Sequence, residues 1–322
     1  MQKNIRSVLV TGASGFLGSH ICEALHEAGY RVHALVRSTS SRRWISHSWL
    51  RIHVAELSDR VALSRILCGV DAVVHAAGAL WGDYHSINTD ITQTIAEESV
   101  RAGIKKFIYV SSIAAGGPSN GPVQRDGNEP DAPCTLYGIS KKDAERFLTG
   151  LSKDIDIVIL RYPMIYGPRD TQGLRLFKTF NIFINPSVGV RHRFISVVYV
   201  KDAARTVVAA IESEVKSGSI YNISDGSNNT FNELYRIIGQ VWHRWALRIP
   251  VPFALIMFGA WFISKVLKAK TAFNPEQLEM FSKRYWLISP RRANLELGWR
   301  PRTEIYKGVR ETLDWYKEMK WL

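Results

Sequence analysis

Residues 8–18 read Val-Leu-Val-Thr-Gly-Ala-Ser-Gly-Phe-Leu-Gly, so three evenly spaced glycines directly follow a short β-branched run. The run predicts a buried strand, and the apolar spacing after it predicts a helix. Glycines in a tight strand-to-helix turn let the backbone approach a diphosphate at the positive end of the helix. We therefore expect a dinucleotide here, held by Gly12, Ser14, Gly15, Phe16, Leu17 and Gly18.

The same alternation continues outward from this turn. Short Val/Ile-rich runs predict strands at 7–10, 31–36, 51–55, 72–75, 107–110 and 157–161. Amphipathic stretches between them predict helices at 18–28, 61–67, 91–102 and 137–151. This order predicts an α/β Rossmann fold with a doubly wound parallel sheet over residues 1–165. Residues 166–322 then form mainly a smaller α+β substrate-binding lid, with a strand and helix near 195–225 returning to the sheet.

Composition narrows the class of protein. The 322 residues carry a formal net charge of +13, but their basic pairs are scattered and lack the aromatic interleaving of a nucleic-acid groove. The three cysteines have the spacing of neither a disulfide framework nor a metal site. We therefore expect no bound metal, and a location in the reducing cytoplasm. Residues 1–6 are polar and basic, and the apolar run after them is far too short for a signal-peptide core.

The choice of cofactor depends on the end of the second strand. An acidic residue that would hold the ribose 2′-hydroxyl of NAD is missing there. The chain instead has Arg37, Ser38 and, close behind, Arg42-Arg43, a cluster suited to a 2′-phosphate. This favours NADP(H), with NAD(H) as the alternative if the loop is merely a solvated basic surface.

Two further segments are candidates for the cofactor site. Ala76, Ala77 and Gly78 follow the fourth strand, and their small size would let the ribose and diphosphate lie close to the backbone. His75 before them is expected to be a packed core residue. Glu56 and Leu57 follow the third strand, where they could face the adenine, although an Asp would be usual at the first position.

The glycine spacing, with Tyr137-x-x-x-Lys141 after a strand ending in Ser111-Ser112, resembles the extended short-chain dehydrogenase/reductase superfamily, also called the NAD-dependent epimerase/dehydratase superfamily. Residues 107–113 resemble its 3β-hydroxysteroid dehydrogenase and dihydroflavonol reductase-like branch. The resemblance implies that Tyr137 exchanges the substrate proton, Lys141 assists it and holds the nicotinamide ribose, and Ser112 orients the substrate oxygen. It also implies that Val110, Tyr162 and Pro163 lie against the cofactor. Without it, Ser111 and Ser112 are equivalent candidates.

Residues 112–118 lack the Tyr and the acidic pair that epimerases and dehydratases of the superfamily usually carry. This favours an oxidoreductase interconverting a secondary alcohol and a ketone. The alternatives are a nucleotide-sugar epimerase/dehydratase with tightly bound NAD, and a non-catalytic dinucleotide-binding sensor or assembly protein.

The C-terminal half bears on substrate and partners. Residues 250–264 are apolar and are followed by Lys265, Lys268 and Lys270, but the run is too short to span a bilayer. It could be core, a lid over an apolar (steroid-, isoprenoid- or lipid-like) substrate, or a peripheral membrane contact through 250–270.

Asp202 begins a predicted helix and is expected to cap it. Relatives commonly pair the helices at 91–102 and 137–151, which favours a homodimer.

Overall fold

The computed structural model describes residues 5–79, 82–188, 192–252, 255, 258–259, 279–280 and 282–322. Most of the 250–270 stretch, on which the core, lid and membrane interpretations depend, lies outside these residues. In the described part, no helix has the length and apolarity that a membrane span requires.

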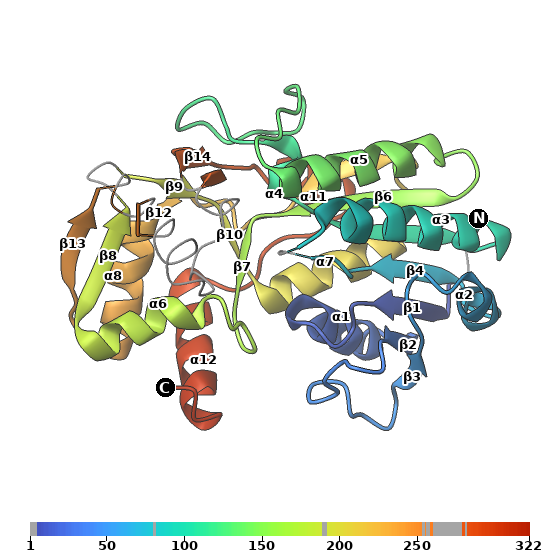
Figure 1. Ribbon diagram of the computed structural model, residues 1–322, viewed down its shortest axis with the longest axis horizontal. Coiled ribbons are helices and arrows are strands. Elements are labelled where there is room, and N and C mark those ends of the chain that lie inside the picture. Colours follow the sequence, from blue (N-terminus) through green and yellow to red (C-terminus); the bar gives the residue numbers. More distant parts are fainter. Residues whose placement is uncertain are drawn as a thin grey trace.

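A seven-stranded sheet forms the larger part of the molecule (Figure 1). Its strands, all paired in parallel, follow the order β11 (Ser219–Asn222), β6 (Asp156–Tyr162), β5 (Lys106–Ser112), β4 (Ala72–His75), β1 (Ser7–Thr11), β2 (Arg31–Val36) and β3 (Arg51–Val54). The strand order reverses at β1, and a ligand crevice is expected at such a reversal in a doubly wound sheet. The predicted fold class is confirmed.

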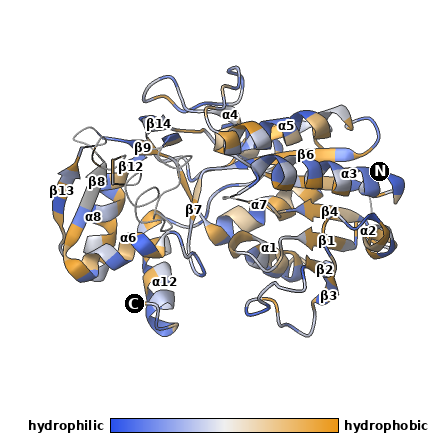
Figure 2. Cartoon of the chain, in the orientation of Figure 1, coloured by the Kyte–Doolittle hydropathy of each residue, from blue (hydrophilic) through white to orange (hydrophobic). Residues whose placement is uncertain are grey.

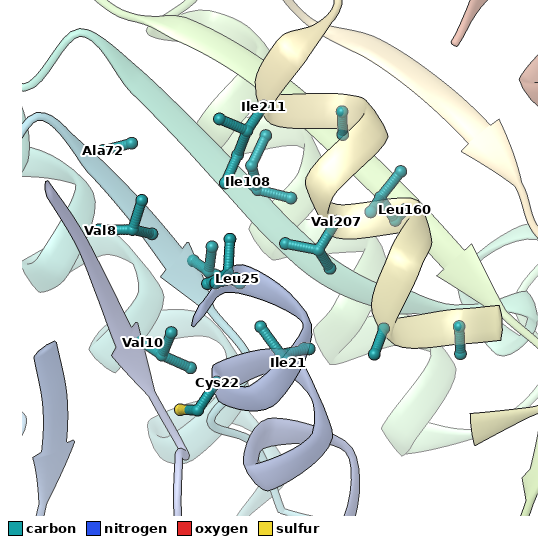
Figure 3. Packing of buried hydrophobic residues seen from close by; sticks show 14 of the residues in the cluster. Val8, Val10, Ile21, Cys22, Leu25, Ala72, Ile108, Leu160, Val207 and Ile211 are labelled. Atoms are coloured by element: carbon teal, nitrogen blue, oxygen red, sulfur yellow. The ribbon is translucent and has the colours of Figure 1, made fainter. Parts of the chain in front are cut away.

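Helices cover both faces of this sheet because its strands are apolar on both sides. Val8 and Val10 of β1 face one layer, which contains α1 (Phe16–Glu27) and α7 (Val200–Glu212). Ile21 and Leu25 of α1 and Val207 and Ile211 of α7 point into this layer, as Figure 3 shows. Leu9 faces the opposite layer, which is formed by α2 (Arg60–Leu67), α3 (Ile91–Arg101) and α5 (Leu136–Gly150). In Figure 2 the central strands are accordingly coloured as hydrophobic.

The chain returns to the main sheet after leaving it, as expected for 195–225. Strand β11 pairs with β6, and α7 packs against α1. The division into domains at residues 165 and 166 stays a prediction.

A smaller lobe lies beside the sheet (Figure 1). Its core packs α6 (Leu174–Lys178), α8 (Phe231–Trp242) and α12 (Ile305–Glu318) together around aromatic side chains such as Phe177, Phe180 and Tyr316. The remaining elements are the π-helix Ser86–Asp90, α4 (Ile113–Gly116), β7 (Met164–Tyr166), the 3₁₀ helix Thr179–Ile182, β8 (Ile184–Val188), β9 (Phe194–Ile195), β10 (Val197–Tyr199), β12 (Asn229–Thr230), β13 (Leu247–Val251), β14 (Tyr285–Trp286) and α11 (Arg291–Glu296).

Asp202 joins the two parts of the molecule rather than capping its own helix. Its carboxylate accepts hydrogen bonds from the backbone N–H groups of Arg302 (3.0 Å) and Thr303 (2.9 Å), just before α12. Its backbone carbonyl accepts one from the indole of Trp299. The expected structural role is therefore present, but the predicted capping is wrong, because the carboxylate bonds a segment about 100 residues away in the chain.

Candidate active site

The glycine turn has the shape that a diphosphate requires. Gly12 has φ +70°, and a Cβ there would lie 2.6 Å from the Ala77 nitrogen. A Cβ on Gly18 would lie 2.1 Å from the Gly12 carbonyl oxygen. Because these distances are shorter than any real contact, only glycine lets the turn lie this close to 76–77 and to its own helix. Ser14, Gly15, Phe16 and Leu17 complete the turn, and α1 begins at Phe16 with its first N–H groups available for an anion.

The loop after β2 presents two arginines to solvent. Arg37, Ser38 and Arg42 are all exposed. Among the described residues, the guanidinium groups of Arg37 and Arg42 make no hydrogen bond or ion pair with the protein. Arg43 differs, because its guanidinium stacks on the Trp44 ring at 4.4 Å and reaches the sulfur of Met319 beyond α12. The structure thus separates two adjacent arginines that the sequence treats as one cluster.

The other predicted cofactor segments lie along the same edge of the sheet. Ala76 and Ala77 are half-buried beside Gly12, and a Cβ on Gly78 would lie 3.2 Å from Lys141 Nζ. Glu56 is exposed after β3, while Leu57 packs against the α2–α3 layer.

The first two catalytic candidates meet where β5 ends and α5 begins. Thr135 caps α5 by accepting a hydrogen bond from the Gly138 N–H (3.0 Å). A Cβ on Gly138 would lie 2.5 Å from the Ala114 carbonyl oxygen, so glycine lets α5 lie directly on α4. This contact brings the Tyr137 hydroxyl next to the Ser112 side chain, close enough for Ser112 to lower the pKa of the phenol. Burial raises the pKa of Tyr137 above its ordinary value, and Ser112 opposes that rise only in part.

Lys141 lies one helical turn further along α5 and is 5% exposed. Its Nζ donates a hydrogen bond to the Val110 carbonyl oxygen (3.0 Å) and lies 4.7 Å from the centre of the Tyr109 ring. Burial lowers the pKa of Lys141 to about 8, because an ammonium group loses its hydration there. Its ammonium is held mainly by a carbonyl and an aromatic ring.

The geometry distinguishes the two serines that the residues alone left equivalent. Ser111 Oγ points the other way and donates a 2.7 Å hydrogen bond to Glu145 Oε1. Ser112 Oγ faces α4 and Tyr137, and it also accepts the Ala114 N–H at 3.2 Å. Ser112 is therefore the serine that faces Tyr137.

The sequence interpretation missed Asn88, which lies in the π-helix before α3. Its amide donates to Ser140 Oγ (3.1 Å), and its Oδ1 accepts the Ala79 N–H (2.8 Å). A Cβ on Gly78 would lie 3.0 Å from that Oδ1. Asn88 thus ties the 76–79 segment to the helix that carries Lys141. No motif in the sequence marks Asn88, which precedes the stretch predicted as a helix at 91–102.

A buried ionic network behind the site was also missed. Arg161, at the end of β6, donates 2.8 Å bonds to Glu145 Oε1 and Asp131 Oδ2, and Lys142 pairs with Asp131. Arg161 holds the pKa of Asp131 at about 2, despite the opposing effect of burial. We call these four residues the ionic network; it fixes α5 against β6 and the loop before α5.

Tyr162 does not reach the site with its side chain. The phenol is 3% exposed in the α1–α7 layer, where its hydroxyl donates to the Ala203 carbonyl oxygen (3.0 Å). Side chains that alternate along a strand face opposite layers, and the Tyr162 side chain faces the α1–α7 layer. At these two positions a ligand could therefore contact the backbone of Tyr162 and the half-buried Pro163.

His75 is a core residue, as expected. Its ring hydrogen-bonds Thr11 Oγ1 (2.7 Å) and Thr92 Oγ1 (3.0 Å), and burial lowers its pKa to about 3. The neutral ring connects β1 to α3 and does not serve as a base near pH 7.

Comparisons with known proteins place this geometry in a family. The model of the NAD dependent epimerase/dehydratase family matches residues 8–224. Sterol-4-alpha-carboxylate 3-dehydrogenase (decarboxylating) from Dictyostelium discoideum is 26% identical over 95% of this chain and 100% of its own length. Ceramide reductase from Caulobacter vibrioides is 28% identical over 98% of this chain and 96% of its own length. UDP-glucuronic acid 4-epimerase from Bacillus cereus, solved with UDP-glucuronic acid and NAD, has a TM-score of 0.80 at 23% identity, covering 97% of this chain and 99% of that one.

The family match spans the glycine turn, the end of β5, the Tyr137–Lys141 helix and the returning strand β11. It confirms the predicted superfamily and the prediction of an NAD(P)-dependent enzyme acting on CH–OH groups. The chain belongs to the NAD-dependent epimerase/dehydratase family.

Proposed function

We propose that this enzyme is an NADP(H)-dependent oxidoreductase that interconverts a secondary alcohol and a ketone on an apolar steroid-, isoprenoid- or lipid-like substrate. The observation that carries the proposal is the placement of Ser112 next to the Tyr137 hydroxyl, with Lys141 one turn further along α5. A tyrosine whose pKa is raised is protonated at neutral pH, so it can donate a proton to a substrate carbonyl oxygen.

The reaction follows from these positions. When bound, the dinucleotide supplies a hydride to the carbonyl carbon in reduction or accepts one in oxidation. Tyr137 gives its phenolic proton to the carbonyl oxygen, which Ser112 orients by a hydrogen bond. Lys141, next to Gly78 and the Val110 carbonyl, would hold the nicotinamide ribose and favour the transient phenolate through its positive charge. The phenolate then regains a proton from solvent.

The NADP(H) preference is supported by the exposed guanidinium groups of Arg37 and Arg42, which pair with no side chain in the part of the chain that the structure describes. Charge-assisted bonds to a 2′-phosphate are worth about 1.5–3 kcal/mol each, so two arginines should favour NADPH over NADH by at least about tenfold. The apolar substrate class is supported by the side chains around Ser112: Ile113 packs with Trp286 and Ile195. It is also supported by the printed names of the sterol dehydrogenase and the ceramide reductase.

An epimerase acting on a nucleotide sugar with tightly bound NAD is the second candidate. The family description and the fold of the UDP-glucuronic acid 4-epimerase favour it. A non-catalytic sensor is the third candidate, and the assembled Ser112, Tyr137 and Lys141 argue against it.

We also propose three properties of the partners and surroundings. A homodimer would form through α3 and α5, with Leu136 and Ile139 of α5 exposed. A cytoplasmic location would suit Cys22, Cys68 and Cys134, none of which forms a disulfide. A peripheral membrane contact would form through 250–270, whose first two residues belong to strand β13.

The first test is titration of the wild type and of an R37A/R42A variant with NADPH and NADH, followed by nicotinamide fluorescence. We expect tighter NADPH binding by the wild type and nearly equal dissociation constants in the variant. Preference of the wild type for NADH would refute the cofactor proposal. Reduction of apolar ketones, with no epimerisation of UDP-glucose, would then decide between the first two candidates; the reverse result would establish the epimerase.

A further inference from the structure

Large apolar side chains gather on the surface of the smaller lobe. Of the fourteen that are exposed among the described residues, seven lie between 182 and 258. We define the docking face as the five of these that lie at the end of the 3₁₀ helix Thr179–Ile182 and in or beside β13: Ile182, Phe183, Trp245, Leu247 and Ile249. Trp245 is 68% exposed and Leu247 is 61% exposed. Isolated exposed apolar residues are ordinary, but a contiguous group marks an interaction surface.

The contacts between these residues show that the face is continuous. The rings of Phe183 and Trp245 lie 5.4 Å apart, and the Leu247 N–H donates to the Phe183 carbonyl oxygen (2.8 Å). Leu247 pairs with Ile184 in the parallel β13–β8 ladder. Ile249 lies two residues further along β13, so it shares a side of the strand with Leu247.

The side chains of the docking face are not packed in the hydrophobic core of the smaller lobe. In the described part of the chain, that core is built mainly from α6, α8 and α12 side chains and includes none of the five residues. In Figure 1, β13 and β8 form the end of the lobe that lies farthest from the seven-stranded sheet. The face is therefore directed away from both the core and the cofactor turn.

The charge of the surrounding chain identifies the kind of partner. Residues 171–188 and 234–252, which are described and carry the docking face, contain no Asp or Glu. They contain two and three Lys or Arg residues, respectively. Lys178, Arg244 and Arg248 are among them and are exposed. The described segments that carry the docking face therefore have a net positive charge.

We propose that the docking face binds the surface of an anionic lipid bilayer. Aromatic and aliphatic side chains would enter the headgroup region, while the flanking Lys and Arg side chains meet lipid phosphates. A second copy of the chain fits less well, because two such cationic surfaces repel each other. A nucleic acid would leave the apolar side chains without a partner. The inference deepens the proposed membrane contact through 250–270, but it does not depend on the cofactor or the reaction, so it can fail or hold independently of the proposed oxidoreductase.

The test is flotation of the full chain with vesicles of phosphatidylcholine alone or with about 30% phosphatidylglycerol, a content typical of a strongly anionic surface. The wild type should float with the anionic vesicles and much less with the neutral ones. A W245S/L247S variant should lower the partition coefficient by about tenfold or more, because two large apolar groups no longer insert. A K178Q/R248Q variant should lower it by a similar factor, since each basic residue contributes about 1 kcal/mol.

Two matched control variants replace exposed apolar residues by Ser and exposed basic residues by Gln on the larger part of the molecule. A V61S/L295S variant removes two side chains that are 63% and 72% exposed, and a K153Q/R65Q variant removes two exposed charges. Both should float like the wild type. Thermal unfolding midpoints within about 2 °C would show that all variants are folded.

Three results would overturn the proposal. In the first, the wild type does not float with anionic vesicles. In the second, W245S/L247S floats as well as the wild type, which would leave only charge attraction. In the third, sedimentation velocity shows that this variant splits a dimer while flotation is unchanged, which would assign the face to a second copy.

Discussion

Lys141 and Lys142 are neighbours on α5, yet their surroundings differ: Lys142 lies among carboxylates, whereas Lys141 lies against a backbone carbonyl and an aromatic ring. Lys142 pairs with Asp131 and lies 3.6 Å from Glu145, within the ionic network. The Lys141 ammonium instead donates to the Val110 carbonyl oxygen, and burial lowers its pKa to about 8 although the charge of Glu145 opposes the fall. The comparison teaches that the charges of the ionic network are paired with opposite charges, whereas the buried Lys141 ammonium has no carboxylate bonded to it among the described residues. Such a group costs stability but can respond to a developing phenolate.

The largest expected effect is chemical and lies on the Lys141 side. Replacing Tyr137 by Phe removes the proton donor and keeps the ring, so kcat should fall by about 10²–10⁴-fold. The dissociation constant for NADPH should change by less than about twofold, because the glycine turn is untouched. Steady-state kinetics and fluorescence titration measure the two quantities. Full activity of the variant would show that another group donates the proton.

Breaking the ionic network should produce the largest loss of stability. Glu145 has no exposed surface and bonds both Arg161 and Ser111. Glu145→Ala leaves a buried guanidinium partly uncompensated, so the free energy of unfolding should fall by about 3–5 kcal/mol. Urea denaturation measures this value.

The control is Glu97→Ala, because Glu97 also pairs with an arginine, Arg60, but at the surface. Its loss should cost less than about 1 kcal/mol. Equal losses in the two variants would mean that the network is no more than a set of surface pairs.

Lys141 and Lys142 should respond to the same substitution with opposite signs. The pKa of Lys141 falls from 10.5 unfolded to about 8 folded. The folded state therefore binds fewer protons between these values, and stability rises as the pH increases from about 8 to 10.5. The full penalty, up to about 3 kcal/mol, is present below pH 8.

Lys141→Met should therefore raise the free energy of unfolding at pH 7 by about 1–3 kcal/mol, after the loss of the Val110 hydrogen bond, while abolishing activity. The gain should disappear near pH 10.5. Lys142→Met should lower stability at pH 7, because Asp131 loses a partner. Chemical denaturation at pH 7 and pH 10.5 distinguishes the two. A destabilised Lys141→Met variant at pH 7 would refute the contrast.

The smallest effects concern the two serines. Ser111→Ala should lower the free energy of unfolding by about 1–2 kcal/mol and leave kcat nearly unchanged, because it removes only the bond to Glu145. Ser112→Ala should lower kcat by about tenfold or more, with at most about 1 kcal/mol lost from the α4 cap. If both variants lose activity to the same extent, the geometric distinction between them is wrong.

Several parts of the site could be predicted because they depend on neighbours in the sequence. The glycine turn, the order of strands and helices, and the spacing of Tyr137 and Lys141 are local patterns with a direct structural meaning. The predicted strand at 107–110 corresponds to the longer β5, Lys106–Ser112, which carries the serines. The position of Asn88 at the centre of the site had no comparable pattern, since it depends on the distance between α3 and α5.

By itself, then, the sequence determined a parallel α/β sheet, a glycine turn made for a diphosphate, and a tyrosine and a lysine on one side of a helix. Only the tertiary structure decided that Ser112 rather than Ser111 faces Tyr137 and that Tyr162 enters the core. It also decided that Arg43 stacks on Trp44, while Arg37 and Arg42 find no partner among the described residues. The reason is physical. The repeating pattern of apolar residues indicates which side of a helix or strand is buried. The hydrogen-bond partner of a particular polar side chain depends instead on segments that can lie a hundred residues away in the chain.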